Sequence, residues 1–169
     1  VEEVGLPVEE ALYSLLIEER LAPLIVFNEG DDKMIEPLLQ HELCMIGSDG
    51  IYHDGGIVHP RVYGTAPRIL GPCVRDRKLF SLEEAVAKLT AKSADAYGLK
   101  DRGRIGEGAF ADLVVFDPDT VTDRATYEDP HQTADGIELV VVNGQPILEN
   151  GTPAVFDGPM PGRTLRYER

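Results

Sequence analysis

Two short and entirely apolar runs, Leu24–Phe27 and Leu43–Ile46, constrain the fold of this chain more than any other feature. Such runs are typical of strands that are buried on both faces, as in a parallel sheet. Apolar residues at helical spacing precede each run, over residues 8–22 and 31–41. The order helix, strand, helix, strand predicts a parallel α/β fold.

The chain between the second run and Gly98 is predicted to be a loop followed by helices. Residues 50–66 are rich in glycine, histidine and proline, and we expect a loop there, with a helix over about 67–78. Ser81 and Glu84 form a capping box that opens another helix. Gly98 marks the end of this helical region.

The pattern changes after Gly98, where strands replace helices. Residues 111–117 read as a strand, and residues 139–148 read as a hairpin whose Asn143-Gly144 pair suits a type I′ turn. The stretch 118–136 is expected to be irregular, and the tail from residue 151 coil-like. The sequence therefore predicts an α/β part over residues 1–98 and a mostly β part over residues 99–169.

Charge and length exclude several classes of protein. The 169 residues carry a formal charge of −14, which argues against nucleic acid and anionic membranes as partners. A complete (β/α)8 barrel needs about 250 residues, so this chain is too short to form one.

Two cysteines, Cys44 and Cys73, without a CxxC motif or a visible secretion signal indicate a reducing compartment, and we expect a cytoplasmic protein. We expect Cys44 to be a buried structural thiol and assign no role to Cys73.

Asp49 is the most prominent candidate for chemistry. It follows the apolar run 43–46 and lies between small residues, in Gly47-Ser48-Asp49-Gly50. A carboxylate at the carboxyl end of a buried strand can act as a general base or a metal ligand. The structural alternative, an Asx-turn that closes the strand, is equally compatible with the pattern.

The following loop adds His53, Asp54, His59, Arg61 and Tyr63. Their spacing matches no compact metal-ligand motif, so exposed or hydrogen-bonded histidines are the favoured interpretation. Arg61 suits bidentate binding of a substrate carboxylate, with a surface salt bridge as its alternative.

Several of these segments together resemble the N-acyl-D-amino-acid deacylases of the amidohydrolase superfamily. The specific part is Gly47-Ser48-Asp49-Gly50, then His59-Pro60-Arg61, then Tyr63-Gly64-Thr65. The segments Ala111-Asp112-Leu113 and Val142-Asn143-Gly144 resemble many amidohydrolases and support the superfamily only.

The resemblance implies a fold. It predicts the last βα units of a (β/α)8 TIM-like barrel, with residues 23–28 as strand seven and residues 43–49 as strand eight. Residues from about 103 would be the C-terminal strands of a small β-sandwich. In these terms, residues 1–98 belong to the barrel and residues 99–169 to the sandwich and tail.

The resemblance also implies an activity, the zinc-dependent hydrolysis of N-acyl-D-amino acids to a carboxylate and a free D-amino acid. Asp49 would shuttle the proton of the metal-bound water to the leaving amine, and would be at most a weak metal ligand. Arg61 would bind the substrate carboxylate, and His59 and Tyr63 would line the same loop.

The family's other zinc ligands, an HxH pair, a cysteine and two histidines, have no counterpart in this sequence. We therefore expect a C-terminal fragment that is inactive alone and that associates with itself or with the missing N-terminal part of the enzyme. Two alternatives stay open. One is a cyclic-amide hydrolase of the dihydroorotase or dihydropyrimidinase type, and the other is a non-catalytic module derived from an amidohydrolase.

Overall fold

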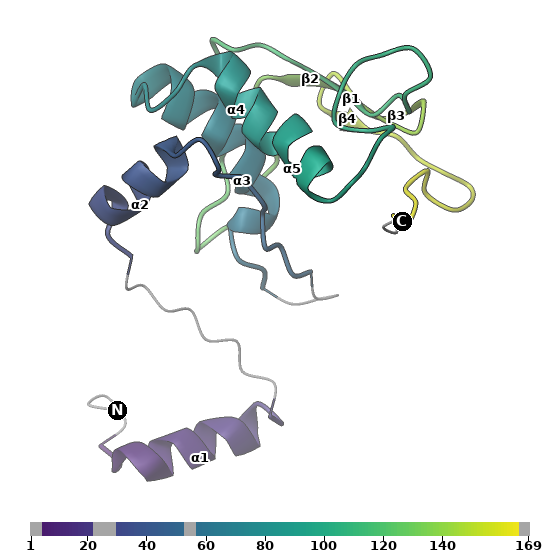
Figure 1. Ribbon diagram of the computed structural model, residues 1–169. Coiled ribbons are helices and arrows are strands. Elements are labelled where there is room, and N and C mark those ends of the chain that lie inside the picture. The colour runs from purple at the N-terminus through teal and green to yellow at the C-terminus, as the bar shows by residue number, and fades with distance from the viewer. Residues whose placement is uncertain (1–4, 22–29, 53–56, 166–169) are drawn as a thin grey trace. The chain divides into compact units, whose positions relative to one another are not determined.

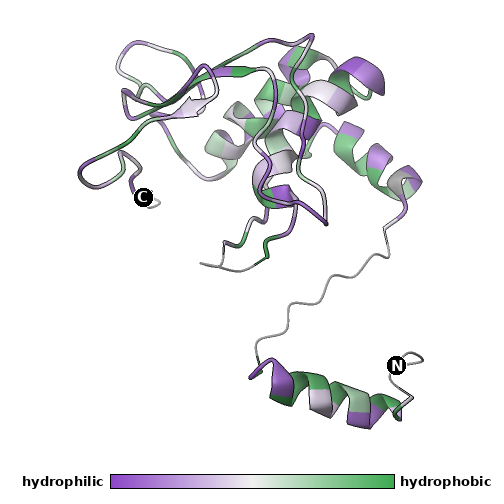
Figure 2. Ribbon diagram, turned by 180° about the vertical axis from the view of Figure 1, so that it is seen from behind, coloured by the Kyte–Doolittle hydropathy of each residue, from purple (hydrophilic) through white to green (hydrophobic). Residues whose placement is uncertain are grey.

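The computed structural model describes residues 5–21, 30–52 and 57–165 (Figure 1). The chain divides into two compact units at the boundary between Ile35 and Glu36. In the first unit, helix α1 (Val8–Glu18) confirms the helix predicted over 8–22, and Pro7 precedes its first turn. Figure 2 shows that α1 is mostly apolar with a few hydrophilic bands, and none of its residues is buried. The strand predicted at 24–27 lies outside the described residues. No helix of the described residues is both long and apolar enough to span a bilayer.

Helix α2 (Asp32–Gln40) confirms the second predicted helix, and the Asp31 carboxylate caps it by accepting the Lys33 N–H at 2.9 Å. The strand predicted at 43–46 is wrong, because residues 44–50 form no regular secondary structure. A strand needs neighbouring strands for its backbone groups, and this segment instead donates the Ile46 N–H to the Lys88 carbonyl at 3.1 Å. As a result Cys44 is half-exposed, not buried as expected.

Helix α3 (Arg61–Arg68) begins inside the segment 50–66 that was expected to be a loop, so that prediction is wrong for residues 61–66. It continues directly into the π-helix η1 (Ile69–Asp76), which covers most of the helix predicted over 67–78. Pro72 has no N–H for an ordinary i→i−4 bond, and its carbonyl accepts the Arg77 N–H five residues on at 2.9 Å. The proline thus explains the wider turn.

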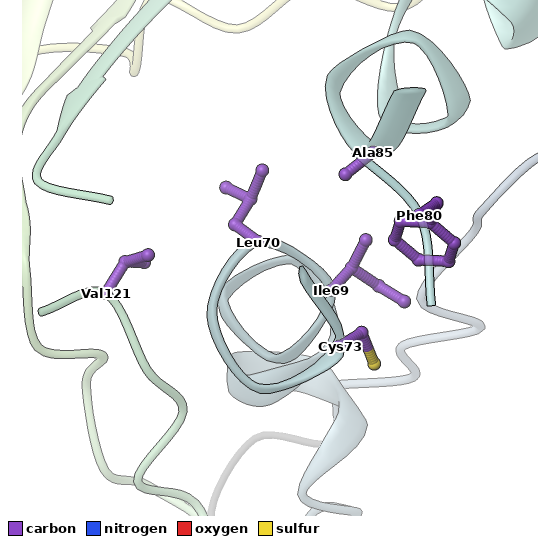
Figure 3. Close-up of a cluster of buried hydrophobic side chains, with 6 residues drawn as sticks. All are labelled: Ile69, Leu70, Cys73, Phe80, Ala85 and Val121. Atoms are coloured by element: carbon purple, nitrogen blue, oxygen red, sulfur yellow. The ribbon is translucent and has the colours of Figure 1, made fainter. Parts of the chain in front are cut away.

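Helix α4 (Leu82–Leu89) begins as the capping box predicted, with the Ser81 hydroxyl accepting the Glu84 N–H at 3.2 Å. Helix α5 (Ala91–Ala96) follows and ends before Gly98, which has a left-handed φ of 69°. These elements surround the core, which is drawn in Figure 3 and consists of Ile69, Leu70, Cys73, Phe80, Ala85 and Val121.

The C-terminal half contains a four-stranded antiparallel sheet in the order β1-β2-β3-β4. Its strands are β1 (Leu113–Phe116), β2 (Ile137–Val142), β3 (Gln145–Glu149) and β4 (Thr152–Pro153). The predicted hairpin is confirmed, because Asn143 and Gly144 join β2 to β3 with φ values of 49° and 80°. Between β1 and β2 the chain is irregular, as expected, apart from one bridge of Thr122 with Asp135.

Hydrogen bonds link the two segments that resemble amidohydrolases in general. The Asp112 carboxylate accepts the Asn143 N–H at 2.7 Å and pairs with Arg102, which also donates to the Asn143 side-chain oxygen at 2.7 Å. The Arg102 guanidinium lies 4.3 Å from the Phe110 ring centroid. These residues hold the hairpin turn against the start of β1, which is a structural role.

Helices give way to strands after α5, as the sequence predicts, but residues on both sides of position 98 belong to one compact unit. Val121 belongs to the irregular segment before β2 and packs against η1 in the core. Arg75 of η1 donates to the Val121 carbonyl at 2.9 Å. The segment that follows β1 is therefore packed onto the helices.

Candidate active site

Asp49 lies on the segment 47–50, beside helix α3. Its φ of 46° is left-handed, a conformation that aspartate tolerates better than most residues with a side chain. Ser48 stabilises the turn by accepting the Gly50 N–H at 3.2 Å. A Cβ on Gly50 would lie 3.4 Å from the Val62 Cα, an ordinary contact distance, so this turn lies directly against α3. The Asp49 side chain is 78% exposed and therefore accessible to a ligand.

Arg61, the first residue of α3, faces Asp49. One terminal guanidinium nitrogen lies 3.0 Å from an Asp49 carboxylate oxygen, and the side chain is 36% exposed. The Arg61 Nε is shielded from solvent and has no hydrogen-bond partner among the described residues. The structure thus brings together the two residues that the sequence analysis put forward for proton transfer and for carboxylate binding.

His59 caps the start of α3. Pro60 already has helical dihedral angles, with φ −51° and ψ −27°, and a proline in the first turn loses no hydrogen bond. The His59 Nδ1 accepts the Arg61 N–H at 3.0 Å. Burial and the positive charge of Arg61 lower the pKa of His59, against an opposing effect of the Asp49 carboxylate. The ring is therefore neutral at neutral pH, as an Nδ1 acceptor requires.

The segment between β1 and β2 contributes two residues that the sequence analysis missed. The Tyr127 hydroxyl lies 3.1 Å from the His59 Nε2, with the rings edge to face at 5.1 Å. The His131 ring lies edge to face with Tyr63 at 5.7 Å. The local sequence predicted only irregular structure here, and no motif pointed to contacts with α3. Tyr63 therefore faces this segment, and its substrate role stays a prediction.

A metal site does not emerge from the described residues. They contain no group of three histidine, cysteine or acidic side chains that could hold an ion. Asp49 offers one carboxylate, and both nitrogens of His59 are engaged within the protein. His53 and Asp54 lie outside the described residues, and Cys73 is buried in the core. A zinc ion is normally bound by three or four side chains, and the described residues do not provide such a set.

Comparison with known proteins gives consistent matches along the chain. It is 46% identical over 150 residues to an N-acyl-D-glutamate deacylase of Alcaligenes xylosoxydans xylosoxydans, covering 88% of this chain and 30% of that protein. It is 43% identical over 165 residues to a D-aminoacylase of the same organism, covering 98% of this chain and 33% of that protein.

Solved structures agree. The crystal structure of the N-acyl-D-glutamate deacylase from Bordetella bronchiseptica, complexed with zinc and a phosphonate inhibitor, matches with a TM-score of 0.66 and 43% identity. The match covers 73% of this chain and 27% of that one.

The chain thus spans about a third of the length of these relatives. Over that third, identity above 40% and a common backbone course show homology. The sequence profile of the amidohydrolase family independently matches residues 35–148. That range contains Asp49, Arg61, helices α3 to α5, strands β1 and β2, and all but the last residue of β3. The chain therefore belongs to the amidohydrolase family.

Proposed function

We propose that this chain supplies two reacting groups of an enzyme that hydrolyses N-acyl-D-amino acids to a carboxylate and a free D-amino acid. The observation that carries the proposal is the 3.0 Å pairing of Asp49 and Arg61, in a chain 46% identical to an N-acyl-D-glutamate deacylase. One residue is a proton acceptor and the other a carboxylate receptor. A linear N-acyl amino acid needs both.

Asp49 transfers the proton. Its exposed carboxylate accepts a proton from the attacking water, whose oxygen forms the new bond to the acyl carbon. The same proton then passes to the amide nitrogen as the carbon–nitrogen bond breaks, so that the amine leaves neutral. A positioned carboxylate of this kind contributes roughly 10²–10⁴-fold to a rate.

Arg61 binds the substrate carboxylate. A guanidinium has five N–H donors in a planar fork, and Asp49 engages only one of its terminal nitrogens. A substrate carboxylate can bind the donors that Asp49 leaves open, through charge-assisted hydrogen bonds. The charge of Arg61 thus holds the amino-acid end of the substrate next to the proton-transferring group.

Zinc belongs to this proposal as the cofactor of the complete enzyme. The deacylase from Bordetella bronchiseptica binds zinc, and such an ion would supply a water of lowered pKa. Since the described residues of this site offer the Asp49 carboxylate and no group of three potential ligands, groups outside them must complete the ligand set. We further propose that in the complete enzyme residues 1–98 contribute the last βα units of a barrel, in which the segment 43–46 becomes a strand only when neighbouring barrel strands pair with it. Residues 99–169 would contribute strands of a β-sandwich.

A chimera tests the proposal. This chain replaces the matching third of the Alcaligenes D-aminoacylase, which supplies the remaining two thirds. We expect the folded, zinc-loaded chimera to release free amine from N-acetyl-D-amino acids and not from their L-enantiomers. Hydrolysis of a cyclic amide instead would favour the dihydroorotase-type alternative. Failure with both substrate classes would favour a non-catalytic module.

An arginine variant of the same chimera tests the carboxylate receptor. We expect Arg61→Ala to raise the KM for N-acetyl-D-amino acids by more than about tenfold, because a charge-assisted hydrogen bond contributes roughly 1.5–3 kcal/mol. Arg104→Ala is the matched control, since Arg104 pairs with Asp95 at 2.6 and 2.7 Å on an exposed surface. An unchanged KM in Arg61→Ala contradicts the assignment.

A further inference from the structure

The contact between Tyr127 and His59 has no part in the proposed reaction, yet it is connected to Arg61. Tyr127 belongs to the irregular segment between β1 and β2, far from α3 in the sequence. Its hydroxyl nevertheless lies 3.1 Å from the His59 Nε2, with the two ring planes at 79°. His59 in turn accepts the Arg61 N–H. Polar contacts therefore join Tyr127 to His59 and His59 to the Arg61 backbone, and the Arg61 side chain reaches from there to Asp49.

The hydrogen bond of Arg61 decides which His59 nitrogen carries the proton. Because Nδ1 accepts the Arg61 N–H at 3.0 Å, Nδ1 is unprotonated. A neutral imidazole then carries its proton on Nε2. The Nε2–H donates to the Tyr127 oxygen, so the tyrosine stabilises the tautomer that leaves Nδ1 free to cap α3.

Tyr127 is held in place by neighbouring contacts of its own segment. Asp123, whose side chain is 8% exposed, pairs with Arg68 of α3 at 2.7 Å. Gly64 allows this approach, because a Cβ there would lie 3.3 Å from the Asp123 Cβ. The Tyr63–His131 ring contact fixes the segment beyond Tyr127. Contacts on both sides thus hold the chain around Tyr127, whose side chain is itself 56% exposed.

We propose that Tyr127 is a positioning residue for Arg61 that acts through His59. Its hydroxyl fixes the Nε2–H tautomer and the ring orientation of His59. His59 Nδ1 then fixes the first turn of α3, from which Arg61 reaches Asp49. The consequence for substrate binding rests on the proposed function, but the coupling itself is a property of this chain.

NMR on the chain alone, labelled with ¹⁵N, tests the coupling without substrate or metal. We expect Tyr127→Phe, which keeps the ring and removes the hydroxyl, to abolish the protection of the His59 Nε2–H. Hydrogen exchange at the Arg61 amide should become about fivefold faster, which corresponds to about 1 kcal/mol. Tyr97→Phe is the matched control, because Tyr97 is 69% exposed on α5's C-terminal side.

A double-mutant cycle shows whether the effect passes through His59. His59→Asn keeps a side-chain acceptor for the Arg61 N–H but is too short to meet Tyr127. We expect Tyr127→Phe to have no further effect on the Arg61 amide in the His59→Asn background. Unchanged Arg61 exchange in Tyr127→Phe, or an equal effect in both backgrounds, overturns the proposal. An inactive chimera, in contrast, would bear on the proposed function and not on this coupling.

Discussion

At the scale of single residues, the Asp49–Arg61 pair is weak as a source of stability. Exposed ion pairs contribute about 0–1 kcal/mol, and the Asp49 carboxylate is largely in solvent. The pair would therefore cost little to open if, as proposed, a substrate carboxylate binds Arg61. Asp49 also keeps a left-handed φ of 46°, a local conformation of the kind often found at functional sites.

His59 makes stability depend on pH in a defined direction. Its pKa is lowered from the ordinary value of 6.5 by burial and by the charge of Arg61, while Asp49 acts in the opposite sense. Between the lowered pKa and 6.5 the unfolded chain binds more protons than the folded chain, so stability rises with pH in that window and is level above it. Protonation also removes the Nδ1 acceptor of the Arg61 N–H.

We expect the Tm of the wild-type chain to fall more between pH 7 and pH 5 than the Tm of His59→Asn. The asparagine keeps the cap and does not titrate in this range. Thermal unfolding of the two proteins at both pH values is the measurement. Parallel pH profiles would show that His59 does not contribute.

At the scale of elements, the sequence predicted correctly those features that depend on contacts between neighbouring residues. The Ser81–Glu84 capping box and the Asn143-Gly144 turn are both present, because each depends on neighbouring residues only. The predicted strand at 43–46 failed, since a strand depends on partners far along the chain. The start of α3 was missed although Pro60, preceded by a capping side chain, was a usable signal.

In the candidate site, too, residues with a local sequence signal were predicted and residues placed by distant contacts were not. Asp49 and Arg61 stood out by residue type and surroundings, and the structure brings them together. Tyr127 could not be found from the sequence, because its role depends on how the irregular segment 118–136 lies against α3. No periodicity encodes that placement.

The junction of η1 with Val121 is the element contact most sensitive to added volume. A Cβ on Gly71 would collide with the backbone carbonyl of Val121, which cannot move without shifting the segment. We expect Gly71→Ala to destabilise the chain by roughly 1–3 kcal/mol despite the better helix propensity of alanine. Gly106→Ala is the control, since nothing lies within 4 Å of a Cβ there. Urea denaturation that shows equal stability for both variants would contradict this packing.

At the scale of the whole molecule, an acidic chain exposes an apolar strand. The formal charge of −14 opposes self-association at low salt. In the opposite sense, Leu113, Val114 and Val115 of β1 are exposed, and the outer edge of β1 has no partner strand among the described residues. Exposed apolar edge strands favour pairing with another chain.

We predict that the isolated chain self-associates in a salt-dependent manner, as the repulsion of acidic surfaces is screened. Sedimentation velocity at increasing protein and salt concentrations measures this directly. A monomer at every concentration, with a single cooperative melting transition, would mean that the exposed strand does not recruit a partner.

The central claim is that Asp49 carries the proton in the hydrolysis of an N-acyl-D-amino acid. Asparagine keeps the shape and tolerates the left-handed backbone of this position, but it cannot accept the proton. The most direct test is the kcat of Asp49→Asn in the zinc-loaded chimera with an N-acetyl-D-amino acid as substrate. The account predicts a kcat at least about a hundredfold lower with a KM changed only a few-fold. A variant that holds zinc and keeps the kcat of the unmodified chimera would contradict it.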